Sequence, residues 1–181
     1  QVNRFIGNFG AIYTPYDWAT ITYRLGTDSY SDERKQIFAI GSNDPDNAPG
    51  GQIEENLIRY NQVYSDLIIS GSKNVHESIT INYTLGNNIT ILDDNYLYSR
   101  GRDLTIPDYY NIGNASDLYS SQQTTQQRNA AFFGEIGFDF QSFLFINLTG
   151  RNEWSSTYGA NEGAAFFPSM NTSFVFCVLM N

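Results

Sequence analysis

The feature that most constrains the fold is a side-chain alternation with a period of two residues. In residues 78–85, "SITINYTL", the apolar side chains of Ile79, Ile81, Tyr83 and Leu85 take every second place. Side chains of a β-strand point alternately to its two faces, so this pattern predicts a strand with one apolar and one polar face. The same period recurs along the chain, and no helical period competes with it. It predicts seven antiparallel strands, which begin near Arg4, Trp18, Asn56, Glu77, Ala131, Phe143 and Ser169.

The connections between these strands alternate between short and long. Short turns are predicted at residues 14–17, 71–74 and 141–142, and long polar connections at 31–52, 93–128 and 155–166. Outer-membrane barrels show the same alternation of connection lengths, with tight periplasmic turns and long extracellular loops. The predicted fold is therefore all-β, an antiparallel segment of about seven strands in a large transmembrane outer-membrane β-barrel. Alternate connections of an antiparallel wall share a side, so we expect the long ones to be extracellular.

A barrel wall of this kind has a lipid face that is apolar and a lumen face that is hydrated. The positions expected to face lipid are Ile21, Tyr23, Ile79, Ile81, Tyr83, Leu144, Ile146 and Leu148. The polar positions of opposite parity are expected to face inward, and they include Thr22, Thr80 and Asn82. The main lumen-facing candidates are Arg24, Asp28, Asn147, Arg151 and Glu153. Aromatic rings near strand ends favour the headgroup level, which predicts an interfacial aromatic belt of Tyr13, Tyr16, Trp18 and Trp154.

Composition excludes several other classes of protein. The chain has 10 Lys+Arg against 19 Asp+Glu, which argues against nucleic-acid binding, because phosphates are neutralised by clustered basic residues. Aromatic residues make up 15% of the chain and charged residues only 16%, which is typical of a β protein. Cys177 is the only cysteine, so a disulfide within the chain is excluded. No apolar run reaches the ~18 residues that a transmembrane helix needs.

Three stretches resemble a known family. They are "RFIGNFGAIYTPYDWATITYRLGTDSYSDER" (residues 4–34), "DLTIPDYYNIGNAS" (103–116) and "GEIGFDFQSFLFINLTGRNEWSSTYG" (134–159), followed by "FFPSMNTSF" (166–174). In this order they resemble the barrel portion of SusC/RagA-type TonB-dependent transporters of Bacteroidetes. The resemblance covers most of the chain, and the "LTGRNEWSST" and "FPS" pair is its most specific part.

This resemblance implies the fold, partners and location of the chain. It implies import of large nutrients, glycans or peptides, across the outer membrane of a Gram-negative bacterium. The implied partners are a SusD-like surface lipoprotein, the TonB complex, outer-membrane lipid and an oligosaccharide or peptide substrate. We expect residues 1–181 to be a partial barrel, an internal fragment without plug domain, TonB box or signal peptide. Its strands would form about a third of a barrel of ~22 strands.

The predicted long connections carry the candidates for ligand or partner contact. Tyr109, Tyr110 and Tyr119 offer ring faces on which sugars or a protein partner could pack. The alternative is that these are solvated loops without a binding role. No cofactor is expected, although the oxygen-rich stretch "NDPDN" at residues 43–47 leaves a calcium ion open.

A soluble secreted β-sandwich, either a glycan-binding module or a glycoside hydrolase, is the alternative interpretation. A hydrolase would need a carboxylate pair such as Glu54 and Glu55, or Asp93 and Asp94. Adjacent carboxylates on a strand point to opposite faces, and those at a turn are usually solvated, which disfavours both pairs. His76 is the only histidine and lies beside a predicted turn, where solvation explains it. We therefore expect no catalytic residue, no metal ligand and no enzyme.

Overall fold

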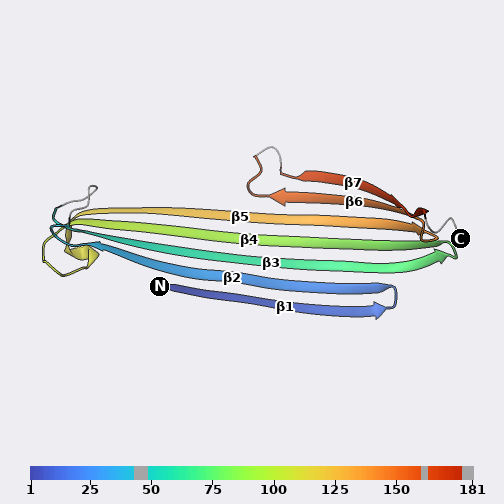
Figure 1. Ribbon diagram of the computed structural model, residues 1–181, viewed down its shortest axis with the longest axis horizontal. Coiled ribbons are helices and arrows are strands. Elements are labelled where there is room, and N and C mark those ends of the chain that lie inside the picture. The colour runs from blue at the N-terminus through green and yellow to red at the C-terminus, as the bar shows by residue number, and fades with distance from the viewer. Residues whose placement is uncertain (43–48, 160–162, 177–181) are drawn as a thin grey trace. The chain divides into compact units, whose positions relative to one another are not determined.

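The computed structural model describes residues 1–42, 49–159 and 163–176. This part of the chain folds into strands joined by tight turns and by longer connections, with one short 3-10 helix, η1 (Ile112–Asn114) (Figure 1). Within the described residues, no helix is long and apolar enough to span a membrane. The strands are β1 (Val2–Tyr16), β2 (Ala19–Phe38), β3 (Gln52–His76), β4 (Ile79–Leu104), β5 (Ala115–Phe140), β6 (Leu144–Ser155) and β7 (Ala165–Phe174).

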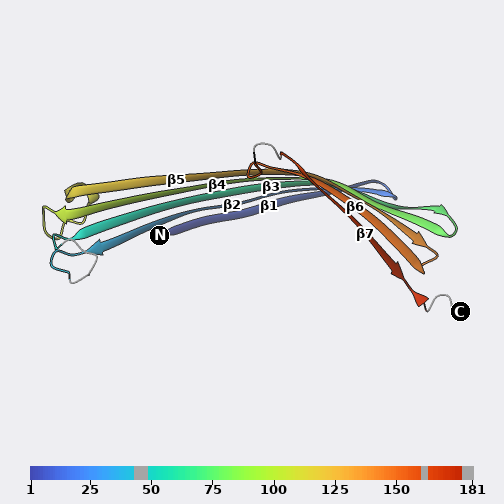
Figure 2. The same cartoon turned by 90° about the horizontal axis from the view of Figure 1, so that it is seen from above.

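All seven strands belong to one sheet, in which each strand is hydrogen-bonded to its neighbours in sequence. Strands β5, β6 and β7 follow one another in the sheet (Figure 2). Their antiparallel pairing places Leu148 between Ile136 and Met170. Strands joined by such tight turns must be antiparallel, because a parallel pair needs a long crossover. The prediction of seven antiparallel strands in one continuous wall is confirmed.

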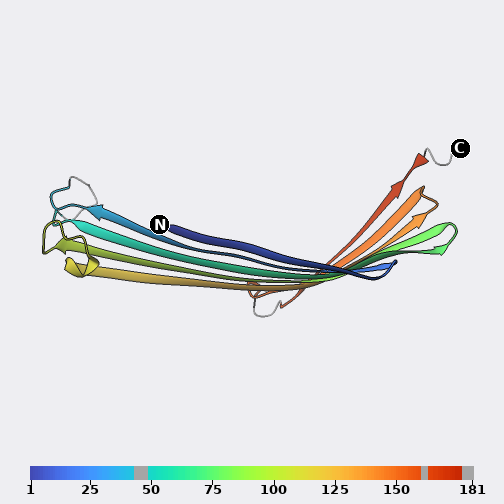
Figure 3. The same cartoon turned by 90° about the horizontal axis from the view of Figure 1, so that it is seen from below.

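The strands are longer than predicted, and the long connections are correspondingly shorter. The predicted connection 31–52 is wrong in extent, because β2 continues to Phe38 and β3 begins at Gln52. The predicted connection 93–128 is wrong in the same way, since only residues 105–114 separate β4 from β5 (Figure 3). In these segments polar side chains occupy both faces, so the period-two signal disappears while the backbone hydrogen bonds of the ladder remain.

The tight turns also lie further along the chain than predicted. They occupy residues 17–18, 77–78 and 141–143, not 14–17 and 71–74. Cross-strand hydroxyl and amide pairs keep the predicted turn residues in their strands: the hydroxyl oxygens of Thr14 and Thr20 are 3.3 Å apart, and Thr80 donates to Asn74 over 2.8 Å.

The described residues group into two compact units, and each long strand contributes to both. Unit 1 contains residues 1–6, 28–62 and 92–126, and unit 2 contains 7–27, 63–91 and the described residues from 127 onward.

Few side chains are buried, because the described residues provide no second layer over the sheet. The buried apolar residues are Ala19, Ile53, Leu104 and Ala131. Large apolar side chains are instead exposed, among them Leu85, Phe132, Phe166 and Met170. The sheet is therefore held by its backbone ladder and by cross-strand side-chain pairs, and its exposed apolar area needs a cover.

Aromatic rings lie over glycines of neighbouring strands within unit 2. A Cβ atom on Gly26 would collide with the ring of Tyr64, and one on Gly86 with the ring of Phe133. Such a ring fills the space that a missing side chain leaves and covers the exposed backbone of the glycine. These pairs tie β2 to β3 and β4 to β5.

Candidate functional site

One face of unit 2 is apolar, and we call it the apolar face. Leu148 lies opposite Ile136 on one side and Met170 on the other, and a Cβ on Gly134 of this face would meet Leu85 Cδ2 at 3.0 Å. A groove of about 540 Å³ is lined by Leu67, Ile69, Leu85, Phe132 and Phe166. Phe132 and Met170 are 60% and 65% exposed, so the described chain leaves this face uncovered.

The opposite face of unit 2 is polar, and we call it the polar face. Asn147 donates to Asn171 over 3.0 Å across β6 and β7. Arg151 Nε lies 2.9 Å from Glu153 Oε2, and its guanidinium stands 5.9 Å from the ring centre of Phe133. An ion pair this exposed contributes about 0–1 kcal/mol, so its main effect is to orient Arg151. The predicted lumen candidates Asn147, Arg151 and Glu153 therefore share one face.

The other two lumen candidates lie on β2. Arg24 belongs to unit 2 and is exposed. Asp28 belongs to unit 1 and receives two hydrogen bonds from Arg4, 2.9 Å from Nε and 2.6 Å from Nη2. This two-pronged geometry fixes the planes of both groups. Arg24 and Asp28 are both even-numbered residues of β2, so they have the same parity along the strand, as the predicted lumen face requires.

The predicted aromatic belt residues all lie in unit 2 and are exposed. The rings of Tyr16 and Trp18 are stacked at 5.1 Å with an interplanar angle of 2°, and Lys73 Nζ stands 5.8 Å from the Trp18 ring. Trp154 meets Phe132 edge-on at 6.1 Å. Tyr13 shares their exposure. Rings with a polar edge beside an apolar face suit a membrane interface. The assignment of these four residues to an interfacial belt stays a prediction.

One face of unit 1 carries a group of tyrosines from four strands, which we call the tyrosine face. Its members are Tyr30, Tyr60, Tyr96, Tyr98 and Tyr119. Tyr30 and Tyr60 stack at 5.1 Å, and Tyr98 lies 6.1 Å from Tyr119. The Tyr96 hydroxyl donates to Asn56 Oδ1 over 2.5 Å. Rings with hydroxyl edges bind sugars and peptides alike, because they combine apolar area with a hydrogen-bonding group.

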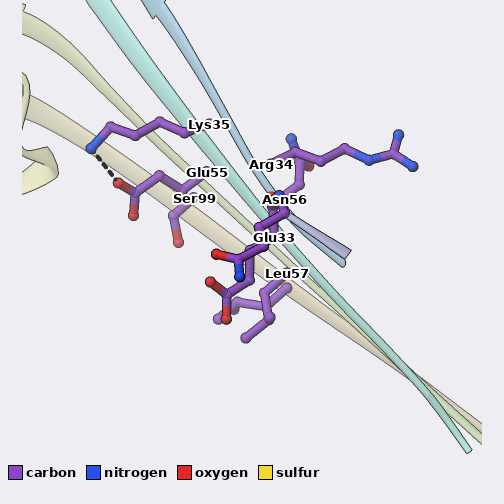
Figure 4. A pocket seen from close by; sticks show the side chains of 9 residues that line it. Glu33, Arg34, Lys35, Glu55, Asn56, Leu57 and Ser99 are labelled. Carbon is purple, nitrogen blue, oxygen red and sulfur yellow. Dashed lines mark hydrogen bonds and ion pairs between the residues drawn. The ribbon is translucent and has the colours of Figure 1, made fainter. Parts of the chain in front are cut away.

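A second cluster on unit 1 ties the connection between β4 and β5 to β2. Lys35 Nζ lies 2.9 Å from Glu55 Oε1, an ion pair between neighbouring strands that Figure 4 shows as a dashed line. The same ammonium donates to the carbonyl oxygen of Tyr110 over 2.8 Å. A groove of about 420 Å³ lies beside this pair and is also lined by Asn56, Leu57 and Ser99.

The Asn114 side chain organises the connection 105–114. It is buried, donates to the carbonyl oxygens of Ile106 and Tyr109 over 2.8 Å each, and accepts from the Ile106 N–H over 3.0 Å. The Tyr110 hydroxyl donates to Asp108 Oδ1 over 3.1 Å. This hydrogen bond to the carboxylate raises the pKa of Tyr110, because ionisation would remove the donor and place two negative charges together.

Of the three predicted contact tyrosines, two lie in this connection and one does not. Tyr109 is exposed and Tyr110 is partly buried. The placement of Tyr119 in a connection is wrong, because β5 begins at Ala115 and Tyr119 belongs to the tyrosine face. The Arg100 guanidinium lies 5.4 Å from the centre of the Tyr119 ring. The contact roles of all three stay predictions.

The residues considered for catalysis have other partners. Glu54 accepts from Gln52 Nε2 over 2.6 Å, while Glu55 pairs with Lys35, so the two carboxylates serve opposite faces of β3. His76 Nδ1 accepts from the Ser78 N–H at the turn. Among the described residues, no group of three His, Cys, Asp or Glu could hold a metal ion. The calcium candidate at residues 43–47 lies outside the described residues.

Sequence reasoning missed the tyrosine face and the role of Asn114. Tyr30 follows Asp28 at the same parity, so extending β2 by one more period would have found it. The other tyrosines of this face lie in strand segments without apolar alternation, where the period-two signal is absent. Nothing local marks Asn114, because its partners are defined only by the folded connection.

The architecture defines the class: an all-β chain whose seven antiparallel strands form one open sheet like that of part of a transporter barrel. No family model and no curated protein matches the chain. Among solved structures, the structure of the RagAB peptide transporter matches with a TM-score of 0.87 at 16% identity, over 96% of this chain and 20% of that one. The RagAB peptide importer matches in its open-open state (TM-score 0.81, 18% identity) and in its closed-closed state (0.82, 17%).

These matches show the fold. The chain spans about a fifth of the length of the chains that it matches. The resemblance to the barrel of SusC/RagA-type TonB-dependent transporters, read from the sequence, is confirmed by this structural match.

Proposed function

We propose that this chain forms part of the barrel wall of a TonB-dependent outer-membrane transporter. The observation that carries the proposal is a single open sheet with an apolar face that nothing in the described chain covers. In water such a face would drive aggregation, whereas in an outer membrane it meets hydrocarbon. The likeness to part of a peptide transporter supports the same assignment.

Strand length supports a membrane location with an extension beyond it. A transmembrane strand needs about 9–11 residues, whereas β3 has 25 residues and β4 has 26. The apolar face belongs to unit 2, which would cross the hydrocarbon. Unit 1, with its polar side chains and the connection between β4 and β5, would be hydrated. The terminal strands β1 and β7 would pair with further strands of the barrel, since a membrane tolerates no open edge.

The proposed activity is import rather than catalysis. The polar face, with Asn147, Arg151 and Glu153, would line the hydrated lumen, and the tyrosine face would contact the substrate at the entrance. We favour peptides over glycans, because the solved structures that match are of a peptide transporter. A SusD-like lipoprotein would cover the outer end and the TonB complex would supply energy through other parts of the protein, in a Gram-negative outer membrane.

The test compares neighbouring residues on β4 in the full-length protein. Spin labels at Ile81 and Asn82 sit one place apart on the strand and should face opposite environments. In reconstituted vesicles, a lipid-soluble quencher should reach the label at Ile81 and not the label at Asn82. Equal quenching at both positions would refute the membrane assignment.

The soluble sandwich, whether a glycan-binding module or a hydrolase, receives no support from the fold. A sandwich packs two sheets face to face over a shared core, and the described strands form a single sheet. A transporter fragment explains the exposed apolar face without a missing layer.

A further inference from the structure

The tyrosine face of unit 1 contains a groove of about 340 Å³. It is lined by residues of four neighbouring strands, namely Tyr30 of β2, Ile58 of β3, Asp94 and Tyr96 of β4, and Gln123 and Thr125 of β5. All six residues belong to unit 1. The volume lies near the lower end of the range for small-molecule sites, roughly 300–1,000 Å³. The groove therefore suits a single side chain or a group of similar size.

Asp94 gives this groove its charge. It supplies the one carboxylate among the lining residues, and none of them is basic. The Oδ1 atom of Asp94 is buried and has no hydrogen-bond partner among the described residues. A carboxylate oxygen in this position has lost its hydration without receiving a donor in exchange, which costs free energy. A cation that binds the carboxylate from the groove would offset that cost.

Other carboxylates with the parity of the tyrosine face have partners within the chain. They are Asp28, which pairs with Arg4, Asp32, which pairs with Arg34, and Glu54, which accepts from Gln52. Asp94 differs from all three, because the residue that would neutralise it is missing from its surroundings. A ligand is the remaining source of positive charge.

Two tyrosine rings that line the groove are held in place by other contacts. Tyr30 stacks on Tyr60 with ring centres 5.1 Å apart, and the Tyr96 hydroxyl donates to Asn56 Oδ1 over 2.5 Å. The face of a tyrosine ring attracts a cation. Because these rings are ordered by their neighbours, a ligand loses little affinity to the ordering of the site.

The remaining lining residues indicate what carries the cation. Ile58 offers apolar contact to the methylene groups of a lysine or arginine side chain, which commonly lie along apolar surface. Gln123 and Thr125 are exposed, and their amide and hydroxyl groups match the N–H and C=O groups of a peptide backbone. A bare metal ion fits less well, since calcium takes about six to eight oxygen ligands. A neutral sugar would leave the charge of Asp94 without a counter-ion.

We propose that this groove binds the basic side chain, lysine or arginine, of a peptide. The ammonium or guanidinium group pairs with the Asp94 carboxylate beside the tyrosine rings, and the methylene groups lie against Ile58. Gln123 and Thr125 hydrogen-bond to the adjacent backbone of the peptide. The inference rests on the proposed function, because it specifies the substrate that the tyrosine face of the transporter contacts.

The test compares Asp94→Asn with Asp93→Asn in the full-length protein in detergent. Both variants remove one negative charge from β4, but Asp93 points to the opposite face of the strand and lines a different groove, so it is the matched control. The probes are two short peptides with blocked ends that differ at one position, lysine in one and norleucine in the other. Lysine then carries the only charge.

The unmodified protein should bind the lysine peptide about tenfold more tightly than the norleucine peptide. Asp94→Asn should remove this preference and leave the affinity for the norleucine peptide unchanged, which also shows that the variant is folded. Asp93→Asn should retain the preference. Equal losses in the two variants, or a loss in Asp94→Asn that is the same for both peptides, would overturn the proposal.

Two further outcomes separate this inference from the proposed function. Equal binding of the two peptides by the unmodified protein would overturn the assignment of the groove and leave peptide import standing. A neutral oligosaccharide that binds the unmodified protein and loses affinity in Asp94→Asn would assign the groove to sugars and overturn it as well. No binding of either peptide would overturn the proposed import of peptides, and this inference with it.

Discussion

The phenyl ring of Phe133 on β5 occupies the space above Gly86 of β4, where a Cβ atom would collide with it. The two residues are far apart in sequence and meet only because β4 and β5 pair in this register. The ring also lies 5.9 Å from the Arg151 guanidinium of β6, so one aromatic side chain connects three strands on the polar face.

Replacement of Gly86 by alanine should therefore destabilise the sheet. Overpacking of this kind costs about 1–3 kcal/mol, measured as a lower denaturant midpoint of the full-length protein. Gly10→Ala is the matched control, since its Cβ would meet only the Tyr23 carbonyl oxygen at an ordinary 3.9 Å. In the double variant Gly86→Ala/Phe133→Leu the collision disappears, so the two effects should not add. Additive losses would show that the ring does not act through Gly86.

The two faces of β6 predict opposite responses to the same substitution. Leu148→Arg places a charge on the apolar face and should cost about 2–4 kcal/mol if that face lies at mid-membrane depth. Thr149→Arg, one residue further, enters the polar face opposite Glu135 and should be tolerated. The amount of folded protein in the outer membrane measures both. Similar levels for the two variants would contradict the face assignment.

The sequence alone was sufficient for the part of the fold in which each strand has one apolar face. Ile79, Ile81 and Tyr83 alternate with polar residues, and that signal located β4 and its orientation. It failed from Asp93 to Leu104, where β4 continues with polar residues on both faces. There the strand is specified by pairing with β3 and β5, which no local pattern records.

The candidate site divides in the same way. Asn147, Arg151 and Glu153 were found because they are polar and hold the parity opposite to the apolar residues of β6. Tyr98 and Tyr119 meet at 6.1 Å through the register of two long strands, so their contact could be known only once the strand ends were known. Turn positions were misplaced by a few residues for a related reason, because Thr14 and Asn74 look like turn residues and pair as strand residues.

Asn114 should control the order of the connection 105–114. Asn114→Ala removes three hydrogen bonds and leaves the Ile106 N–H without its partner, a loss of about 1–3 kcal/mol for a buried group. Proteolytic cleavage within residues 105–111 of the full-length protein should become faster. Asn111→Ala is the control, since its side chain accepts only from the Gly113 N–H over 2.9 Å. Equal cleavage of both variants would assign the order of the connection to its backbone rather than to Asn114.

The last prediction concerns the side of the membrane on which the connection between β4 and β5 emerges. An epitope inserted between Pro107 and Asp108 falls in a connection, where insertions are tolerated, and should be reached by antibody on intact cells that produce the full-length protein. The same epitope inserted within residues 120–127 interrupts β5, shifts the strand register and should lower the amount of folded protein. Labelling at Pro107 only after the outer membrane is permeabilised would place these connections in the periplasm. That result would reverse the predicted orientation of the strands across the membrane, and the tyrosine face would no longer lie at an extracellular entrance.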